Sequence, residues 1–490
     1  MKLINTVLVS MCSCSIFFFA TQGRANNEFQ QWMQQQSQGV SAQKKEFQEY
    51  KDKRDKEFTA FLKSQWKPVD IVKGEVLDEA PKPDVMPVAE PPPEPTVTPA
   101  TKPVVISVPR PAPVKQPETA PLAVAPSGRP VDVDFFGRQV RFYHDASLNQ
   151  RFNSRINKDA VSDYWSALSR SQYQVLLNQL EEQKVSLRLN DWAYASLIHK
   201  LAMAIDNNRR NESALLSWFL LAKSGYKARI AFDNSTIFLL IPSKQTMFEI
   251  SYFTFSGKRY YAVEFEGNKQ KLGRVYTYDG EYPDANKEFD MQVTSVVASN
   301  DKDARRHLSF DFEGKRYNID VTYDRGRVKF FGTYPQLNLD MYFASDVYKV
   351  TATPLQKQLA AHMKGMSEQQ AVNFLLRFVQ TSLKYQTDEQ QFGEENYLFP
   401  EETLFYPYSD CEDRAVLFAW LVQSLLGLQV VGLDYPGHVA AAVHFNEKVS
   451  GDSVDYQGKR YVVTDPTYIN ASAGMTMPDF KKFRPTVINY

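Results

Sequence analysis

Prolines divide this chain into segments that can fold and one that cannot. Of the 27 prolines, 16 lie in residues 81–130. Proline has no backbone N–H and fixes φ, so a stretch this rich in proline builds no hydrogen-bonded core. Residues 68–130 are therefore predicted to be a disordered, extended linker. At about 3.1 Å per residue, residues 81–130 reach on the order of 150 Å at most. The folded body is expected to begin near Val131.

The first 25 residues have the pattern of a signal peptide. Lys2 precedes an apolar stretch, Val7–Ala20, and the small residues Gly23 and Ala25 offer a cleavage site. The alternative is an uncleaved membrane anchor, which is disfavoured because the apolar stretch is short for a span and a Gln-rich region follows. Residues 1–25 therefore predict export, to the periplasm or cell envelope or out of the cell.

Residues 26–67 are expected to form a polar, amphipathic helical segment. Large apolar side chains fall roughly on one face, and they are Phe47, Tyr50, Phe58, Phe61, Leu62 and Trp66. Two interpretations stand equally. Either the helix is solvated, or it docks on an envelope partner or pairs with itself. Lys+Arg and Asp+Glu are both 57, so nothing indicates a nucleic-acid partner.

The folded body is predicted to be α+β. A hairpin near 134–142, then helices to about Leu221 and strands after Lys227, indicate an α+β domain over 131–270. Alternating aromatic and polar residues indicate a β-rich segment over 271–345. Helices return in the last domain, 346–490, and a long loop, Gln386–Ser409, then leads directly to a cysteine. Loops of that length inside compact domains are usually functional.

Cys411 is the one cysteine expected to remain, since Cys12 and Cys14 leave with the signal peptide. It precedes an apolar helix that Gly427 should end. Ser409 and Glu412 have capping-box spacing, which places Cys411 in the first helical turn, where backbone N–H groups favour a thiolate. Neighbouring acidic residues oppose this by raising the thiol pKa. The alternative, an inert buried thiol, is disfavoured because acidic and polar residues flank it.

His438 and Asp465 complete a candidate catalytic set. His438 starts one predicted strand after Gly437, and Asp465 ends another before Pro466. A thiol needs a base, and the base needs an anion that fixes its tautomer. Asp434 is the rival orienting carboxylate. The other histidine of the same strand, His444, is about 20 Å away along the strand and is expected to be structural.

These residues resemble the motifs of the transglutaminase-like superfamily, a papain-related fold with a Cys–His–Asp triad. The resemblance rests on Asp410-Cys411-Glu412-Asp413, on Gly437-His438 and on Asp465-Pro466-Thr467, and it covers about residues 350–490. It implies that Cys411 is the nucleophile, His438 the general base and acid, and Asp465 the orienting group. Val439 and Ala440 follow the histidine where the family often has an aromatic residue, so the acceptor and substrate pocket are not implied.

The expected activity is thiol-dependent acyl transfer on a protein or peptide amide. Water is the default acceptor, which favours a protease or amidase over a transglutaminase. No cofactor or metal is expected, because no CxxC, HExxH or Gly-rich phosphate loop occurs. The alternative is a non-catalytic binding or scaffold protein of the cell envelope.

An earlier part of the chain, about residues 150–270, repeats features of the candidate catalytic domain. Trp218 and Gly225 lie 202 residues before Trp420 and Gly427, and Gly257-Lys258-Arg259-Tyr260 lies 201 before an identical tetrapeptide. These offsets place Arg209, Thr236 and Glu264 at the positions of Cys411, His438 and Asp465. A degenerate copy without a triad is one hypothesis. Chance is the other, because the same tetrapeptide also occurs at 314–317.

Overall fold

The structure is a computed structural model that describes residues 46, 48–64, 66–77, 82–83, 85–90, 128–152, 155–265, 273–293 and 303–490. The predicted signal peptide, residues 1–25, lies outside the described residues, as do residues 26–45 and 91–127. The chain divides into two compact units, Met1–Ser64 and Gln65–Tyr490. Helices and mostly antiparallel sheets make the fold α+β, as the sequence predicts.

The described part of the first unit is a helix over residues 48–64. The hydroxyl of Thr59 donates to the carbonyl of Asp55 one turn earlier, and the rings of Phe58 and Phe61 stack with centroids 5.8 Å apart. Trp66 already belongs to a strand, β1 (Trp66–Val69), so the helix predicted to run to residue 67 ends earlier. None of the described helices is long and apolar enough to cross a bilayer.

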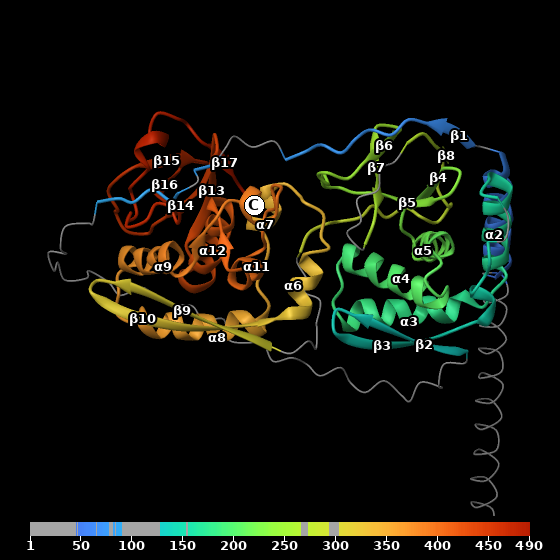
Figure 1. The fold of residues 1–490 in the computed structure, drawn as a ribbon, viewed down its shortest axis with the longest axis horizontal. Coiled ribbons are helices and arrows are strands. Elements are labelled where there is room, and N and C mark those ends of the chain that lie inside the picture. The colour runs from blue at the N-terminus through green and yellow to red at the C-terminus, as the bar shows by residue number, and fades with distance from the viewer. Residues whose placement is uncertain are drawn as a thin grey trace, which may run out of the picture. The chain divides into compact units, whose positions relative to one another are not determined.

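The second unit contains two modules (Figure 1). The first module comprises the described residues from 128 to 293. Its elements are β2 (Arg129–Phe135), β3 (Arg138–His144), η1 (Ala146–Leu148), α2 (Lys158–Ser169), α3 (Tyr173–Ser186), α4 (Asp191–Ile205), α5 (Arg210–Lys223), β4 (Arg229–Phe232), β5 (Ile237–Pro242), β6 (Tyr252–Phe255), β7 (Lys258–Val263) and β8 (Val275–Tyr278). The β2–β3 hairpin packs on α3 and α4, and α5 packs on the sheet.

The second module comprises residues 303–490. Its elements are β9 (Asp303–Phe312), β10 (Lys315–Asp324), α6 (Arg325–Phe331), α7 (Leu339–Phe343), α8 (Lys349–His362), α9 (Glu368–Ser382), β11 (Lys384–Tyr385), α10 (Asp388–Gln391), α11 (Pro400–Phe405), β12 (Tyr408–Ser409), α12 (Cys411–Leu426), β13 (Gln429–Tyr435), β14 (His438–His444), β15 (Ser453–Tyr456), β16 (Lys459–Thr464), η2 (Pro478–Phe480) and β17 (Thr486–Ile488). The β9–β10 hairpin packs on α8 and α9, and α12 packs on the sheet.

Local sequence explains where the elements that position the candidate site begin and end. Helix α9 starts at a capping box in which the Ser367 hydroxyl accepts from the Gln370 N–H at 3.2 Å and the Gln370 side chain accepts from the Ser367 N–H. Helix α12 is apolar and buried almost throughout, and it ends at Gly427, whose φ of 67° is the left-handed conformation that glycine adopts most readily. Gly437, with φ 75°, lies in the tight turn between β13 and β14.

The sheets of the two modules have the same strand order. The first sheet runs β6-β7-β5-β4-β8, with β1 added at the end, and the second runs β15-β16-β14-β13-β17. Both are antiparallel throughout. In each module a hairpin and several helices precede one buried helix, α5 or α12, which is followed directly by the sheet. The modules therefore share a hairpin, a buried helix and a sheet of the same strand order, and the second module has further short helices and strands before α12.

The strand registers agree with the offsets found in the sequence. Ile230 pairs with Leu239, and adding 202 to both numbers gives Gly432 and Ala441, which also pair. Across the next pair of strands, Leu239 pairs with Val263 as Ala441 pairs with Thr464, so the offset has become 201 on the second strand. The one-residue slip inferred from the sequence thus falls between β5 and β7.

The tetrapeptide Gly-Lys-Arg-Tyr marks a hairpin turn at all three of its positions. In β6–β7, β9–β10 and β15–β16 the turn is formed by a residue with positive φ followed by this glycine. The hairpins β6–β7 and β15–β16 occupy equivalent places in the two sheets, whereas β9–β10 does not. The tetrapeptide alone therefore does not identify a repeat, but two of its copies lie at matching positions.

The predicted linker, residues 68–130, begins with segments that contact the folded body. Strand β1 pairs with β8, and Val72 forms a bridge with Tyr252. Further along, Val88 forms a parallel bridge with Ile469 of the second module. Proline leaves carbonyl groups free to accept hydrogen bonds, so a proline-containing segment can still lie along a strand or loop.

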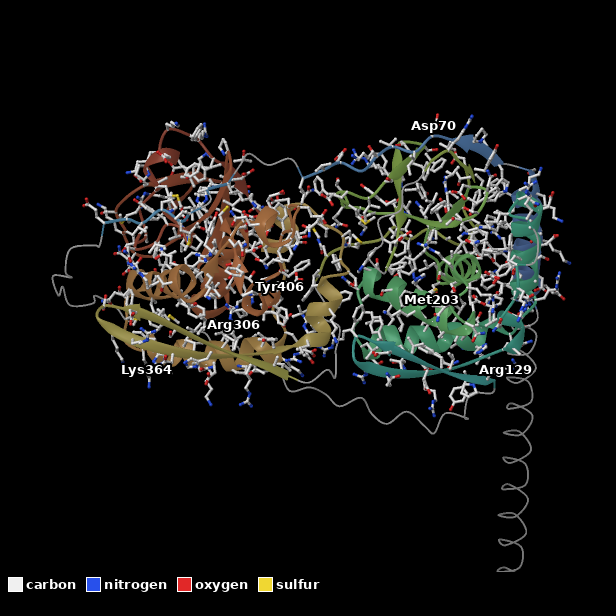
Figure 2. All side chains as sticks on the ribbon, viewed as in Figure 1. Asp70, Arg129, Met203, Arg306, Lys364 and Tyr406 are labelled. Atoms are coloured by element: carbon white, nitrogen blue, oxygen red, sulfur yellow. The ribbon has the colours of Figure 1, made fainter. Side chains whose placement is uncertain are left out.

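Two segments contain more helix than the sequence predicts. The segment expected to be β-rich, 271–345, ends in the short helices α6 and α7. The expected long loop, Gln386–Ser409, contains α10, α11 and β12. Tertiary contacts hold this segment, since the Arg306 guanidinium on β9 donates to the carbonyls of Leu404 and Tyr406 (Figure 2). Such short elements lack a hydrophobic period long enough to be recognised in sequence.

Candidate active site

Cys411 is the first residue of α12, so the prediction that it lies in the first turn is confirmed. The predicted capping box is wrong. Asp410, not Ser409, is the N-cap residue, and it makes no side-chain cap. Ser409 belongs to β12, which pairs in parallel with β11, and its hydroxyl accepts from the Arg414 guanidinium at 3.1 Å. Because Ser409 is extended and already bonded, it cannot cap the helix.

The Cys411 side chain is fully buried, contrary to the prediction from its acidic and polar neighbours. Its sulfur donates to Oε2 of Glu412 at 3.0 Å. The neighbours do not expose it, because the whole run from Ser409 to Arg414 is buried with it. Burial, followed by the charges of Glu412 and Asp410, raises the pKa of the Cys411 thiol well above its usual value. In this conformation the thiol is protonated at neutral pH.

His438 and Asp465 form a buried pair. Nε2 of His438 lies 2.8 Å from Oδ2 of Asp465, and the two side chains are 1% and 2% exposed. The other oxygen of Asp465 accepts from the backbone N–H groups of Thr467 at 2.9 Å and Tyr468 at 3.1 Å. This carboxylate is therefore held on both sides and can fix the orientation and tautomer of the imidazole.

The other ring nitrogen of His438 is available for chemistry. Within the described part of the chain, Nδ1 is buried and has no hydrogen-bond partner. The Phe480 ring lies against the imidazole, with centroids 4.7 Å apart and an interplanar angle of 27°. The hydrogen bond of the Cys411 sulfur goes to Glu412 and not to this nitrogen. The structure thus forms the base–carboxylate half of the predicted triad, while the thiol is turned to a different partner.

Two alternatives weighed from the sequence take no part in this pair. Asp434 is exposed on β13, so the carboxylate at the His438 ring is Asp465. His444, at the other end of β14, is only partly buried and its Nδ1 lies 2.9 Å from the carbonyl oxygen of Arg460. It is a hydrogen-bonded structural histidine, as the sequence predicts.

Gln380 of α9 supports the loop that carries Asp465, although nothing in the sequence identified it. Its buried side-chain amide donates to the carbonyls of Asp465 at 3.0 Å, Tyr468 at 2.7 Å and Ala471 at 3.1 Å. A single side chain thereby satisfies three carbonyls of an irregular segment. Glutamine on a predicted amphipathic helix gives no sequence signal for such a role.

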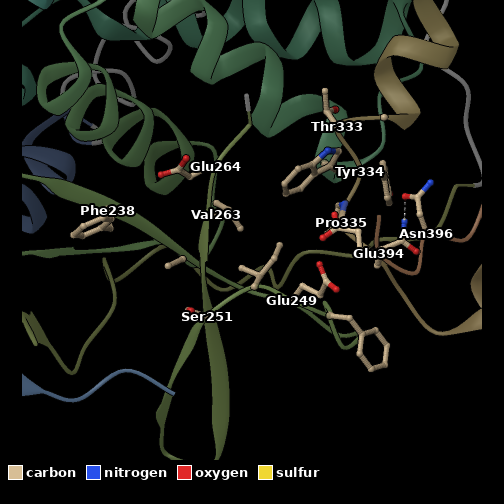
Figure 3. A pocket seen from close by; sticks show the side chains of 16 residues that line it. Phe238, Glu249, Ser251, Val263, Glu264, Thr333, Tyr334, Pro335, Glu394 and Asn396 are labelled. Carbon is tan, nitrogen blue, oxygen red and sulfur yellow. Dashed lines mark hydrogen bonds between the residues drawn. The ribbon is translucent and has the colours of Figure 1, made fainter. Parts of the chain in front are cut away.

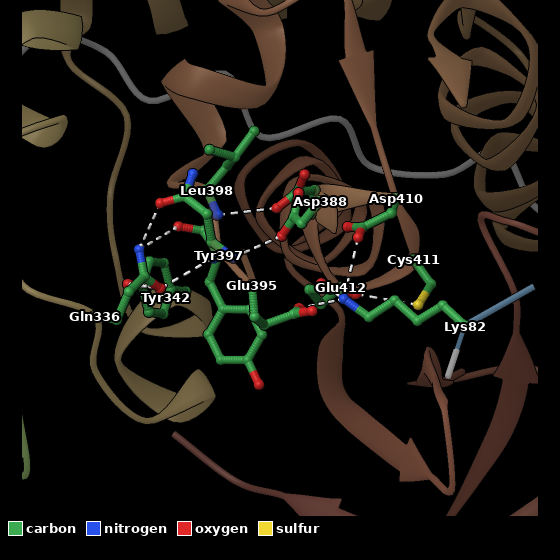
Figure 4. Close-up of polar contacts among 12 residues, drawn as sticks. Lys82, Gln336, Tyr342, Asp388, Glu395, Tyr397, Leu398, Asp410, Cys411 and Glu412 are labelled. Carbon is green, nitrogen blue, oxygen red and sulfur yellow. Dashed lines mark hydrogen bonds and ion pairs between the residues drawn. The ribbon is translucent and has the colours of Figure 1, made fainter. Parts of the chain in front are cut away.

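Acidic side chains gather beside Cys411. One oxygen from each of Asp388, Glu395, Asp410 and Glu412 lies within 4.8 Å of the others, a group that could hold a metal ion. Here the Lys82 ammonium lies among these carboxylates (Figure 4). It pairs with Glu395 and Glu412 and lies 3.0 Å from Oδ2 of Asp410. We call these four acidic residues the carboxylate cluster.

Burial raises the pKa of two carboxyl groups of the cluster, those of Asp410 and Asp388. Desolvation is the main cause that raises the pKa of Asp410, to about 8, and the charge of Glu412 adds to it. The pKa values of Asp388 and of neighbouring Asp413 are raised further, again mainly by burial, because several carboxylates share a space shielded from water. The Lys82 ammonium acts in the opposite direction and favours the ionised forms.

Arg414 is the second cation beside the cluster. It is fully buried, and its guanidinium donates to Ser409 Oγ and to the carbonyls of Leu383 at 2.9 Å and Gln380 at 3.4 Å. Burial lowers its pKa to about 10, so it stays charged at neutral pH. Its contacts join α12 to the end of α9.

The residues missed by the sequence analysis come mainly from the segments judged least structured. Lys82 lies in the predicted linker, and Asp388 and Glu395 lie in the predicted loop. Their charges were visible, but nothing local connects them to Cys411, which is more than 300 residues from Lys82. Only tertiary structure brings them together.

Cavities in the described chain lie away from the predicted triad. One of about 270 Å³ is lined by Phe238, Ser251 and Val263 of the first module and by Tyr334 and Asn396 of the second, among others (Figure 3). A neighbouring cavity of about 230 Å³ is lined only by residues of the first module. Neither of these two cavities is lined by Cys411, His438 or Asp465.

The first module has no triad at the equivalent positions. The register offsets place Thr236 at the position of His438 and Glu264 at that of Asp465. Glu264 pairs with Arg210 at 2.8 Å, across the N-terminus of α5. Arg209, at the Cys411 position, pairs instead with Glu212 at 3.2 Å. Ion pairs thus occupy the positions of the thiol and the carboxylate, and an uncharged threonine occupies that of the imidazole.

Comparison with known proteins gives no match: no protein-family model, no curated protein and no solved structure matches this chain.

Proposed function

We propose that the second module is a thiol-dependent acyl-transfer enzyme that acts on peptide or side-chain amides. Cys411 is the nucleophile, His438 the general base and acid, and Asp465 the orienting carboxylate. The observation that carries the proposal is the buried His438–Asp465 pair at 2.8 Å, which leaves Nδ1 of His438 without a partner in the described chain. A base fixed in this way suits proton transfer from a thiol at a helix N-terminus.

The reaction would follow the usual course of thiol acyl transfer. Nδ1 of His438 takes the Cys411 proton, and the thiolate attacks the carbonyl carbon of the amide. The C–N bond then breaks, His438 returns the proton to the leaving amine, and a thioester remains on Cys411. Water, or an amine, attacks the thioester and releases the acyl group. Backbone N–H groups of the first turn of α12 are candidates for stabilising the oxyanion.

Hydrolysis is the favoured outcome. Transfer to an amine requires that water be excluded while an acceptor binds. The two cavities of about 270 and 230 Å³ are not lined by Cys411, so neither of them supports an acceptor site for transfer. A protease or amidase is therefore proposed ahead of a transglutaminase. The signal-peptide pattern of residues 1–25 favours an exported enzyme of the periplasm or cell envelope.

The proposal extends to the fold. Residues 346–490 are proposed to form a transglutaminase-like catalytic domain, and the first module to be a degenerate copy that has lost its triad. The shared strand order and the matching strand registers support a degenerate copy, since a chance similarity between two stretches of sequence would not reproduce both. The repeated unit is proposed to include the β9–β10 hairpin and α8, since the β2–β3 hairpin and α3 pack together in the same way in the first module.

The proposal is tested by labelling Cys411 with iodoacetamide across a range of pH in wild type and in His438→Ala. A catalytic pair predicts that removing the imidazole slows labelling near neutral pH by about tenfold or more, because the base no longer forms the thiolate. Cys411→Ser is the control for other labelled groups. Release of amines from a mixed peptide library should require both side chains.

A scaffold is the second candidate, and the buried, protonated Cys411 thiol favours it. If the protein is a scaffold, His438→Ala leaves the labelling rate unchanged and no peptide is cleaved. That result would refute the catalytic proposal.

A further inference from the structure

A segment of the predicted linker contacts residues that neighbour Cys411 and Asp465 in the candidate active site. Residues 82–83 and 85–90, called the strap below, contact the second module through both backbone and side chains. Ala89 donates its N–H to the Ile469 carbonyl at 2.7 Å, and Ile469 donates in return to the Pro87 carbonyl at 3.0 Å. The Tyr385 hydroxyl donates to the Pro83 carbonyl at 2.7 Å. An extended backbone held in this way has the binding mode of a peptide added to a strand edge.

Two side chains of the strap, those of Ala89 and Met86, contact residues of the second module. Ala89 is 2% exposed and belongs to an apolar cluster with Tyr468, Ala471 and Met477, close in sequence to Asp465. The sulfur of Met86 accepts from the Arg414 guanidinium at 2.7 Å. The strap is therefore packed, rather than resting on the surface.

Lys82 is the charged end of the strap, and its side chain is 5% exposed. Its ammonium enters the carboxylate cluster and pairs with Glu395, Asp410 and Glu412. A buried ammonium is costly unless it is paired, and several buried carboxylates are equally costly without a cation. The carboxylates therefore stabilise the buried Lys82 ammonium, and the ammonium in turn stabilises the buried carboxylates.

Two carboxylate oxygens of the cluster are left to face a cation once the hydrogen bonds of the described chain are counted. In the described chain, Oδ1 of Asp388 and Oδ1 of Asp410 are buried and have no hydrogen-bond partner. Apart from Arg414, which bonds to Ser409 and to carbonyls, Lys82 is the cation that reaches this space. An acidic space shaped around one primary ammonium is a site for a lysine side chain.

Glu412 connects this site to the nucleophile. One of its oxygens pairs with the Lys82 ammonium, and the other accepts from the Cys411 sulfur (Figure 4). While Lys82 is bound in this way, Glu412 also accepts the thiol hydrogen of Cys411. This contact competes with any contact between the thiol and His438.

We propose that the carboxylate cluster is a binding site for a lysine side chain in an extended, proline-containing peptide, and that the chain's own strap fills it and blocks Cys411. This inference rests on the proposed function for its meaning as autoinhibition, but lysine binding and thiol access can be measured without catalysis. Displacement of the strap would open the thiol and release Glu412 from Lys82.

The experiment compares full-length wild type with Lys82→Ala by following iodoacetamide labelling of Cys411 against pH. The plateau at high pH reports access to the thiol, whereas the midpoint reports its pKa. We expect the plateau rate of Lys82→Ala to rise by about tenfold or more, because the strap is no longer held. The midpoint should move down, because opening the site relieves the burial that is the largest cause of the raised thiol pKa, and this outweighs the smaller loss of the Lys82 charge. Lys73→Ala, at an exposed position upstream, is the control and should match wild type.

A peptide added in trans tests the lysine site itself. The probe is the decapeptide of residues 81–90, and its control has alanine in place of Lys82. The lysine peptide should return the plateau rate of Lys82→Ala toward that of wild type, and the alanine peptide should not. Equal effects of both peptides would overturn the lysine site. An unchanged plateau in Lys82→Ala, with hydrogen exchange showing that residues 85–90 have lost their protection, would overturn the blocking role. Retained protection would overturn the role of Lys82 in holding the strap.

These outcomes are separate from those that test catalysis. If His438→Ala is labelled at the wild-type rate, the proposed enzymatic activity is refuted, but the proposal of a lysine-binding site that controls access to the Cys411 thiol still stands. Failure of the Lys82→Ala test removes the strap's role but leaves the His438–Asp465 pair and its proposed chemistry.

Discussion

At the scale of single residues, the candidate site depends on buried charges that stabilise one another. Arg414 and Lys82 bring two positive charges to a region that contains Asp388, Asp410 and Asp413, all with raised pKa values. Such groups contribute little net stability as a set, because desolvation offsets their attraction. Removing one charged group is expected to destabilise the protein, because the remaining groups stay buried without the charge that balanced them.

Replacing Arg414 by methionine is therefore expected to destabilise the protein by about 3–5 kcal/mol. The change removes one of the two cations beside the buried carboxylates, and it leaves the Leu383 and Gln380 carbonyls without a donor. Urea denaturation measures the loss. Arg141→Met is the matched control, because Arg141 pairs with Asp132 on the surface and its loss should leave the urea midpoint unchanged. Equal midpoints for the two variants would contradict a structural role for Arg414.

At the scale of elements, short helices place acidic side chains where solvent does not reach them. Helix α11 begins after Phe399, and the Glu402 carboxylate accepts from the Phe399 N–H at 3.1 Å. Burial is the first cause that raises the pKa of Glu402 to about 8, from a usual value of 4.5. The folded state thus keeps a proton on Glu402 that the unfolded state releases at lower pH.

Stability linked to Glu402 should fall as pH rises. Above about pH 4.5 the unfolded state loses its proton while the folded state holds it, so the free energy of unfolding decreases until about pH 8 and is then constant. Glu402→Gln removes this loss. Relative to wild type, the variant should gain on the order of 4–5 kcal/mol between pH 5 and pH 9.

Chemical denaturation at several pH values tests this expectation. The control is Glu389→Gln at an exposed position of α10, whose difference from wild type should not change with pH. A Glu402→Gln difference that is equally constant would show that the Glu402 carboxyl ionises as an exposed one does.

At the scale of the whole molecule, two modules share the strand order of their sheets but differ in the residues at the candidate site. The second has a buried histidine–carboxylate pair, and the first has the ion pair of Arg210 with Glu264. A fold can keep its packing after its chemistry has gone, because the core and the site involve different residues. The first module is then expected to contribute stability or binding, and no catalytic group.

The matched substitutions Asp465→Asn and Glu264→Gln test this asymmetry. Asp465→Asn should lower kcat on a cleaved peptide by about 10⁴-fold, because the imidazole loses the anion that sets its tautomer. Glu264→Gln, at the equivalent position, should leave kcat unchanged. A comparable loss in both variants would mean that the first module takes part in catalysis.

Much of the local structure could be predicted from the sequence. The buried helix after Cys411, its end at Gly427, the strands that begin at His438 and end before Asp465, and the 202-to-201 offset all agree with the structure. These features depend on local periodicity, on glycine and proline, and on spacing, which neighbouring residues determine. The capping box at Ser409 failed because β12 takes that residue into an extended strand.

What the sequence by itself determined was the set of chemical groups and their order: a thiol at a helix start, an imidazole and a carboxylate at strand ends, and a proline-rich segment. Tertiary structure alone decided that Cys411 is buried, that its sulfur bonds to Glu412, and that Lys82 lies among the carboxylates. The physical reason is that burial, and the pairing of charges that burial requires, depends on contacts between residues hundreds of positions apart. No local pattern encodes those contacts.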